Sequence, residues 1–109
     1  MGTSKTDLFT DEQNDLAALA KAIAHPARVA ILQHLAKISA CVCGDIVEEV
    51  GLAQPTVSQH LKELKAVGLI QGTIEGTSVC YCINPVTWKR CKTLFATFFA
   101  PERLKTSCC

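Results

Sequence analysis

The chain has 109 residues, of which 49% are hydrophobic and 19% charged, and its formal net charge is +1 at pH 7. This composition is typical of one globular domain and excludes a disordered chain. No apolar run approaches the roughly 18 residues of a membrane helix, and the N-terminal residues lack the charged-then-apolar pattern expected of a secretory signal. Because the net charge is close to zero, any binding to nucleic acid must depend on the local placement of a few polar and basic side chains.

The N-terminal part of the chain predicts two helices with a break between them. Thr10 and Gln13 have the spacing of a capping box, and the apolar positions that follow recur with helical periodicity at Leu16, Leu19, Ala20 and Ile23. Pro26 ends this helix and opens the next, because the residue before a proline is displaced from helical geometry. His25 is expected to cap the second helix locally, and the residues expected on or near the buried side of that helix are Val29, Ala30, Leu32 and Leu35.

A short strand and a third helix are expected next. Residues 38–43, ISACVC, favour β structure, and Asp45 then stands where a helix N-terminus favours a carboxylate. The apolar positions of this third helix are Ile46, Val47 and Val50, and Gly51 ends it.

Residues 54–66 predict a fourth helix with one apolar and one polar face. Pro55 suits the first helical turn, Val57, Leu61 and Leu64 form the apolar face, and Gly68 ends the helix. The side chains expected to face outward are Thr56, Ser58, Gln59, His60, Lys62 and Lys65. This face suits a solvated surface, but it also has the chemistry to bind base edges and phosphates, and two helices joined by a tight turn form a helix-turn-helix.

The C-terminal part predicts a β-hairpin and a last helix. Both flanks of Gly76 alternate in polarity, which indicates a hairpin, and a hairpin after a helix-turn-helix is a wing. The last helix is expected from Thr87 to about Phe99, with its apolar face at Trp88, Cys91, Leu94, Phe95, Phe98 and Phe99. The first and last helices carry more apolar surface than a small core can cover, so we expect a dimer interface there, with packing inside the monomer as the alternative.

The predicted fold is therefore mostly α with a small β-wing (α+β), namely a homodimeric winged helix-turn-helix. We expect one domain over residues 1–109, with its core at about 10–99 and a tail at 100–109.

The chain resembles the arsenic-responsive (ArsR) branch of the ArsR/SmtB family of winged-helix metalloregulatory repressors. The motifs AHPARVAILQHL, CVCGDIVEEV, QPTVSQHLKELKAVGLI and a wing ending in YCINP carry this resemblance, over roughly residues 15–99. It implies a cytoplasmic homodimeric repressor, not an enzyme, that binds double-stranded operator DNA until a soft metal or metalloid binds its cysteines. The DNA-facing positions that it implies are Gln54, Thr56, Ser58, Gln59 and His60, with Lys62 near a phosphate.

Two features depart from the family pattern. The wing tip reads Glu75-Gly76-Thr77, where the family often has Arg or Lys, so wing contact with phosphates is in doubt. In the best-known arsenic repressors another cysteine follows the CVC motif after three residues, but here that position is Ile46. The set of thiolates must therefore be completed elsewhere in the chain.

The chain contains 7 cysteines, an odd number without a secretory signal, which argues against a disulfide scaffold and for free or metal-bound thiols. Thiolates select soft ions: trivalent arsenic or antimony with three sulfurs, or Cd(II) or Zn(II) with four ligands. In winged-helix folds the strand before the third helix pairs with the second wing strand. Side-chain alternation would then direct Ile38, Ala40, Val42, Val79, Tyr81 and Ile83 to the core and bring together on the outer face Cys41, Cys43, Cys80 and Cys82. Packing as small apolar residues is the alternative for these cysteines.

A second candidate site comprises Cys91, Cys108 and Cys109. The last helix has no histidine, which excludes the interfacial His/Asp zinc site of the zinc-sensing relatives; the histidines are His25, His34 and His60. The competing function is a thiol-redox or sulfide-responsive regulator of the same fold, although residues 27–36 lack the cysteine that such relatives use. A thiol enzyme would need a C-x-x-C motif or a cysteine with a positioned base, and neither is present.

Overall fold

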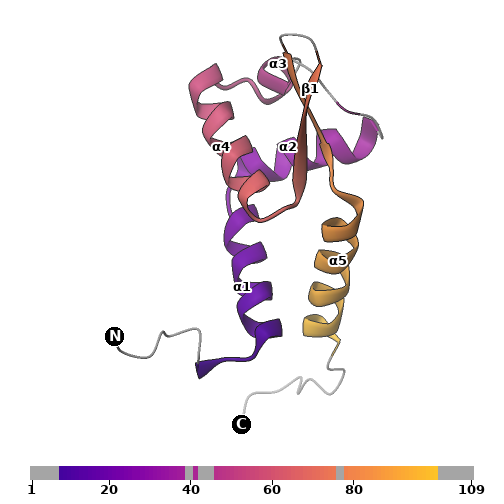
Figure 1. The fold of residues 1–109 in the computed structure, drawn as a ribbon. Coiled ribbons are helices and arrows are strands. Elements are labelled where there is room, and N and C mark those ends of the chain that lie inside the picture. The colour runs from indigo at the N-terminus through magenta and orange to yellow at the C-terminus, as the bar shows by residue number, and fades with distance from the viewer. Residues whose placement is uncertain (1–7, 39–40, 42–45, 76–77, 101–109) are drawn as a thin grey trace, which may run out of the picture.

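The computed structural model describes residues 8–38, 41, 46–75 and 78–100. Figure 1 shows a body formed by α2 (Pro26–Ile38), α3 (Ile46–Val50), α4 (Gln54–Ala66) and a hairpin, from which α1 (Asp11–Ile23) and α5 (Pro85–Phe99) extend side by side. The helix-turn-helix is α3–α4, and the hairpin that follows it is the wing. The predicted mostly α fold with a β-wing is confirmed. Within the described residues, no helix combines the length and apolar character that crossing a membrane requires.

Polar side chains define where three of the helices begin. The capping box is present: the Gln13 backbone N–H donates to Thr10 Oγ1 (3.1 Å), and the Thr10 N–H donates to Gln13 Oε1 (2.9 Å). His25 caps α2 as predicted, because its Nδ1 accepts from the Ala27 N–H at 3.1 Å. Asn84 Oδ1 accepts from the backbone N–H of Val86 at 3.1 Å. This cap lets α5 begin at Pro85, earlier than the predicted Thr87.

The core lies where α2, α4 and the start of the hairpin meet. Its buried side chains are Leu19, Ile31, Leu32, Leu35, Ile46, Val57, Leu61, Leu64, Leu69 and Ile70. The predicted apolar face of α4 is confirmed, but on α2 the prediction was wrong for Val29 and Ala30, which are exposed. The buried face of α2 also includes Ala27 and Ile31. Val29 precedes Ile31 by two residues, which is about 200° around a helix of 3.6 residues per turn.

The wing is a two-stranded antiparallel sheet, with β1 (Ile70–Glu75) paired to β2 (Ser78–Ile83). Its register places Ile70 opposite Ile83 and Thr73 opposite Cys80. The predicted strand at 38–43 is wrong at Ile38, where α2 continues and the side chain is exposed. Extending an existing helix adds one hydrogen bond per residue, so it outweighs the weak β preference of a short segment. Ala40, Val42 and Cys43 lie outside the described residues.

Two glycines end the helices of the helix-turn-helix. Gly51 follows α3 with φ 78°, and Gly68 follows α4 with φ 82°. Both predicted helix stops are therefore confirmed, and both positions use a conformation that strains any residue with a Cβ. Their surroundings differ, because a Cβ on Gly51 would meet nothing within 4 Å, whereas one on Gly68 would lie 3.2 Å from Thr87 Oγ1.

This difference yields a matched pair of variants. Gly51→Ala and Gly68→Ala should each lower the free energy of unfolding through strain at positive φ, by about 1 kcal/mol. Gly68→Ala should cost about 1 kcal/mol more, because its Cβ crowds Thr87. Urea denaturation measures both losses, and Thr87→Ala should remove the excess in the Gly68→Ala background. Equal losses at the two glycines, or an excess that survives Thr87→Ala, would contradict this account.

Candidate functional site

The face of α4 opposite the core is polar and open to solvent. Val57, Leu61 and Leu64 hold the helix on the core, and the exposed residues include five predicted site residues, namely Gln54, Thr56, Ser58, Gln59 and Lys62. The Gln59 amide donates to Glu63 Oε1 at 3.1 Å. The face therefore presents amide, hydroxyl and ammonium groups on a firmly docked helix, and these groups can hydrogen-bond base edges and phosphates.

His60 does not belong to this exposed face. Its side chain is 7% exposed, so the prediction that it faces outward was wrong. The spacing explains the error: residues 57, 60, 61 and 64 follow the i, i+3, i+4, i+7 pattern of one helix face. His60 Nδ1 accepts from Arg28 Nε at 3.0 Å, and its ring lies 4.4 Å from the His25 ring, measured between centroids. Burial, followed by the charges of His25 and Arg28, lowers the pKa of His60.

The wing offers little for phosphate binding. Its described strands, IQGTIE and SVCYCI, contain no lysine or arginine, and the tip residues Gly76 and Thr77 lie outside the described residues. Tyr81 and Ile83 pack against the core as predicted. Val79 was also expected to face the core, but it is 45% exposed and lies opposite exposed Ile74.

Two of the predicted metal ligands meet at one hollow. Cys41 and Cys82 both line a cavity of about 440 Å³, together with Leu35, Ala36, Ile83, Pro85 and Trp88. The lining comes from α2, from Cys41 beyond its end, from the end of β2 and from the start of α5. Cys41 is exposed and Cys82 is half-buried, with its sulfur 3.8 Å from Gln71 Nε2. The structure therefore brings together thiols from the two C-x-C motifs, on which the predicted site depends.

Cys80 differs from the prediction. Alternation along β2 puts it on the same face as Cys82, but its side chain is fully buried, not on an outer surface, and it is disulfide-bonded. The physical reason is that α2 packs against β2. Cys43 lies outside the described residues. Among the residues that are described, no group of three or more His, Cys, Asp or Glu side chains could hold a metal ion.

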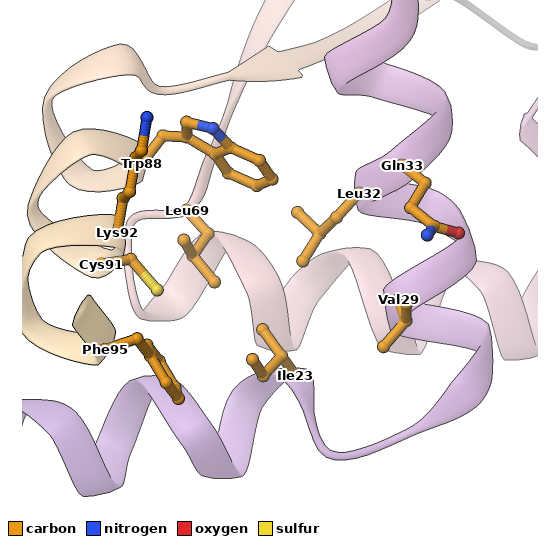
Figure 2. Close-up of a pocket in the computed structure, with 9 residues that line it drawn as sticks. All are labelled: Ile23, Val29, Leu32, Gln33, Leu69, Trp88, Cys91, Lys92 and Phe95. Carbon is orange, nitrogen blue, oxygen red and sulfur yellow. The ribbon is translucent and has the colours of Figure 1, made fainter. Parts of the chain in front are cut away.

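The alternative site is only partly described. Cys91 lies on α5 and its sulfur points toward a mainly apolar pocket of about 440 Å³ between α1, α2 and α5 (Figure 2). Burial raises the pKa of the Cys91 thiol, which disfavours the thiolate that metal binding and nucleophilic attack require. Cys108 and Cys109 lie outside the described residues.

Helices α1 and α5 present apolar side chains that the monomer leaves uncovered. They pack together and are joined by an ion pair between Asp15 and Arg90. No described residue of α5 is fully buried, and Phe98 and Phe99 are 59% and 72% exposed. Leu19 was predicted to be part of this excess surface, but it belongs to the core. Helix α1 packs against α5 and also against the core helices α2 and α4, so a side chain of α1 such as Leu19 can be buried in the core.

Comparison with known proteins identifies the family. Residues 25–71 match the family described as bacterial regulatory protein, arsR family. The HTH-type transcriptional repressor SmtB of Mycobacterium tuberculosis H37Rv is 43% identical over 63 residues, covering 58% of this chain and 46% of that protein. The chain thus spans about half the length of this relative. The uncharacterized HTH-type transcriptional regulator MJ1325 of Methanocaldococcus jannaschii is 43% identical over 68 residues, covering 62% of this chain and 75% of that protein.

A solved structure shows the same fold. The homodimeric winged helix-turn-helix DNA-binding domain of Mb0332 from Mycobacterium bovis matches with a TM-score of 0.66 and 23% identity, over 95% of this chain and 98% of that one. The relatives are transcriptional regulators, which agrees with the prediction that the chain is not an enzyme. With its family match, its relatives and its winged helix-turn-helix in agreement, the chain belongs to the ArsR family of bacterial transcriptional regulators.

Proposed function

We propose that this chain is a transcriptional repressor that binds operator DNA as a homodimer through α4 and is released when a thiophilic ion binds its cysteines. The observation that carries the proposal is the exposed polar face of α4, held on the core by Val57, Leu61 and Leu64. A docked helix with such a face, followed by a wing, has the layout that enters a major groove.

The roles of the residues follow from their chemistry. The amides and hydroxyls can contact base edges, and these residues are Gln54, Thr56, Ser58 and Gln59. Lys62 would contact a phosphate. His60 is left out of this set, because its ring is buried behind the helix. With a net charge of only +1, a single domain would bind weakly, and two half-sites on one dimer supply the missing affinity.

The proposed dimer forms through α1 and α5. Its support is the exposure of Trp88, Phe98 and Phe99 along one helix, since such aromatic side chains are typical of interface cores. The homodimeric state of the Mb0332 domain, whose fold this chain shares, adds support.

The proposed inducer site is centred on Cys41 and Cys43 and completed by Cys80 or Cys82. Its support is the hollow that Cys41 and Cys82 share. A sulfur that can form a disulfide, as Cys80 does, can also share a soft ion with a second thiolate after reduction. The residues fit trivalent arsenic or antimony, with Cd(II) or Zn(II) as alternatives. Because the hollow touches α2, β2 and α5, an ion there would act on both the wing and the proposed dimer helix.

A second candidate function is a thiol-redox regulator of the same fold. The disulfide at Cys80 favours it, because closing and opening such a bond beside α2 and the wing could control DNA binding directly. Structural disulfides are rare in reducing compartments, where those present are often redox-sensing.

Reduction by a monothiol that does not chelate arsenic separates the two functions. A redox regulator would change its DNA affinity on reduction alone, whereas an ion sensor would require the ion.

For the DNA-reading face, Ser58→Ala and Gln59→Ala should each weaken specific binding by about 1–3 kcal/mol, because each removes a hydrogen bond to a base edge. The probe is a duplex selected by the wild-type protein from a random library, and an unselected duplex gives non-specific affinity. Both variants should bind the unselected duplex nearly normally, whereas Lys62→Ala should weaken binding to both. Equal losses on the two duplexes for the polar variants would show that α4 does not read sequence.

For the dimer, sedimentation should show a wild-type dimer at micromolar concentration and a monomer for the Phe98→Asp, Phe99→Asp double variant. Placing two carboxylates in a proposed apolar interface would leave buried charges without partners. Ile74→Asp on the wing is the matched control, since Ile74 is also an exposed apolar side chain (77%) but lies on β1, opposite Val79 of β2, and not on the proposed interface helices. A wild-type monomer, or an aspartate variant that stays dimeric, would exclude this interface.

For the inducer site, the Cys41→Ser, Cys43→Ser double variant should bind DNA but fail to release it with arsenite. A chain truncated after Ser107 should respond nearly normally. Cys82→Ser and Cys91→Ser form a matched pair, of which only the former should weaken arsenite binding to the DNA-free protein. In the wild-type protein, arsenite should weaken DNA binding by about 1–3 kcal/mol, the usual size of allosteric coupling. A response that is lost on truncation and kept in the double serine variant would move the site to Cys91, Cys108 and Cys109.

A further inference from the structure

A polar cluster lies on the side of α4 opposite its exposed polar face, where α1, α2 and α4 meet. Arg28, in the first turn of α2, donates in two directions: Nη1 to the Ala22 carbonyl at 3.1 Å and Nε to His60 Nδ1 at 3.0 Å. The His25 ring lies against the His60 ring on the same side. One guanidinium thus joins the end of α1, the start of α2 and the middle of α4.

This link differs in kind from the apolar contacts that also hold α4. Apolar contacts are non-directional, so they permit small rotations and slides of a helix on its core. A hydrogen bond from a rigid guanidinium fork is directional and restricts both. The guanidinium is itself anchored, because the Ala22 carbonyl is among the last four of α1, which lack helical partners and attract positive charge.

The link requires a neutral His60. Since Nδ1 accepts from Arg28, the ring proton of the neutral form lies on Nε2. Protonation would put an N–H on Nδ1, facing the N–H of Arg28, so the hydrogen bond would be lost and two cations would face each other. The His25 Nδ1 also accepts a hydrogen bond, from the Ala27 N–H.

The charged surroundings of His60 disfavour its protonation. From the α1–α2 corner, the groups that act on it are His25 and Arg28. On α3 and β1 the side chains that the structure describes carry no charge, whereas Glu48, Glu49 and Glu75 lie outside them. Lys21, near the end of α1, is exposed. On α4 itself, Lys62 is exposed and Glu63 accepts a hydrogen bond from Gln59.

We propose that Arg28 and His60 are positioning residues for specific DNA binding, and that protonation of His60 releases α4 from its DNA-reading orientation. The proposal rests on the proposed function of α4. Acid should therefore lower the preference for a selected sequence, while contacts to phosphates remain. Burial, His25 and Arg28 lower the pKa of His60 from 6.5. The contribution of neutral His60 to the stability of the folded protein is therefore complete above pH 6.5, and it is lost as the pH falls through the lower pKa of the folded protein.

The main test measures the ratio of specific to non-specific affinity by fluorescence anisotropy at about pH 7.5 and about pH 5.5. The probes are a duplex selected from a random library by the wild-type protein at the higher pH, and an unselected duplex. The wild-type ratio should fall on the order of tenfold in acid, which lies within the usual range of coupling between two sites in a protein. His60→Gln should keep the ratio within roughly threefold across this range, because its amide oxygen accepts from Arg28 at either pH.

Two further variants separate positioning from general stability. Arg28→Lys should lower the ratio on the order of tenfold already at the higher pH, because an ammonium lacks the fork that reaches both acceptors. His34→Gln replaces a histidine outside the cluster, and it should keep the wild-type dependence on pH. A wild-type ratio that does not change with pH, or a change that is equal in wild type and His60→Gln, would overturn the proposal.

Hydrogen exchange of the DNA-free protein provides a test that does not depend on DNA or on the folding of a variant. After correction for intrinsic rates, the amides of α4 should lose roughly tenfold more protection than those of α5 between the higher and the lower pH. Equal losses would overturn the inference whatever the DNA measurements give. If no duplex can be selected at the higher pH, the proposed function fails, and hydrogen exchange alone decides whether the cluster controls α4.

Discussion

The docking of α4 on the core is the constraint on which the rest of the molecule depends. Val57 and Leu64 are almost completely buried, and both lie on the side of the helix opposite the polar groups. Because each such side chain contributes about 1.5–3 kcal/mol by leaving water, the apolar face decides which way the helix turns. The same choice determines which side chains face solvent and are available for the proposed contacts with DNA. One side of α4 therefore stabilises the fold, and the opposite side is the one proposed to read the DNA sequence.

Much of the fold follows from local rules that can be read in the sequence. The Thr10 capping box, the break before Pro26 and the glycines after α3 and α4 act within a few residues, so neighbours along the chain suffice to predict them. Long-range packing is harder. Ile38 favours a strand in isolation, but the helix already formed by α2 extends through it.

The candidate site shows the same division. The exposure of Ser58 and Gln59 could be predicted because it follows from helical periodicity. The burial of His60 was available from the same periodicity but was missed, because a polar residue on an apolar face is usually assigned to solvent. Its partner Arg28 lies 32 residues away, and no local pattern indicates that contact. The burial of Cys80 is also a tertiary effect, since it depends on α2 lying against the wing.

The length of α5 has a mechanical consequence. It contains 15 residues, and its first turn borders the hollow shared by Cys41 and Cys82. At 1.5 Å per residue the helix is about 22 Å long, so a tilt of about 5° at its beginning would carry Phe99 about 2 Å sideways. Shifts of about 1–2 Å are the size that repacks subunit interfaces. The beginning of α5 thus lies beside the thiols, and its other end carries the most exposed aromatic side chains, so a small tilt at the beginning gives a larger displacement at the end. A contraction of the hollow too small to disturb the fold would therefore change the spacing between the two subunits of the proposed dimer.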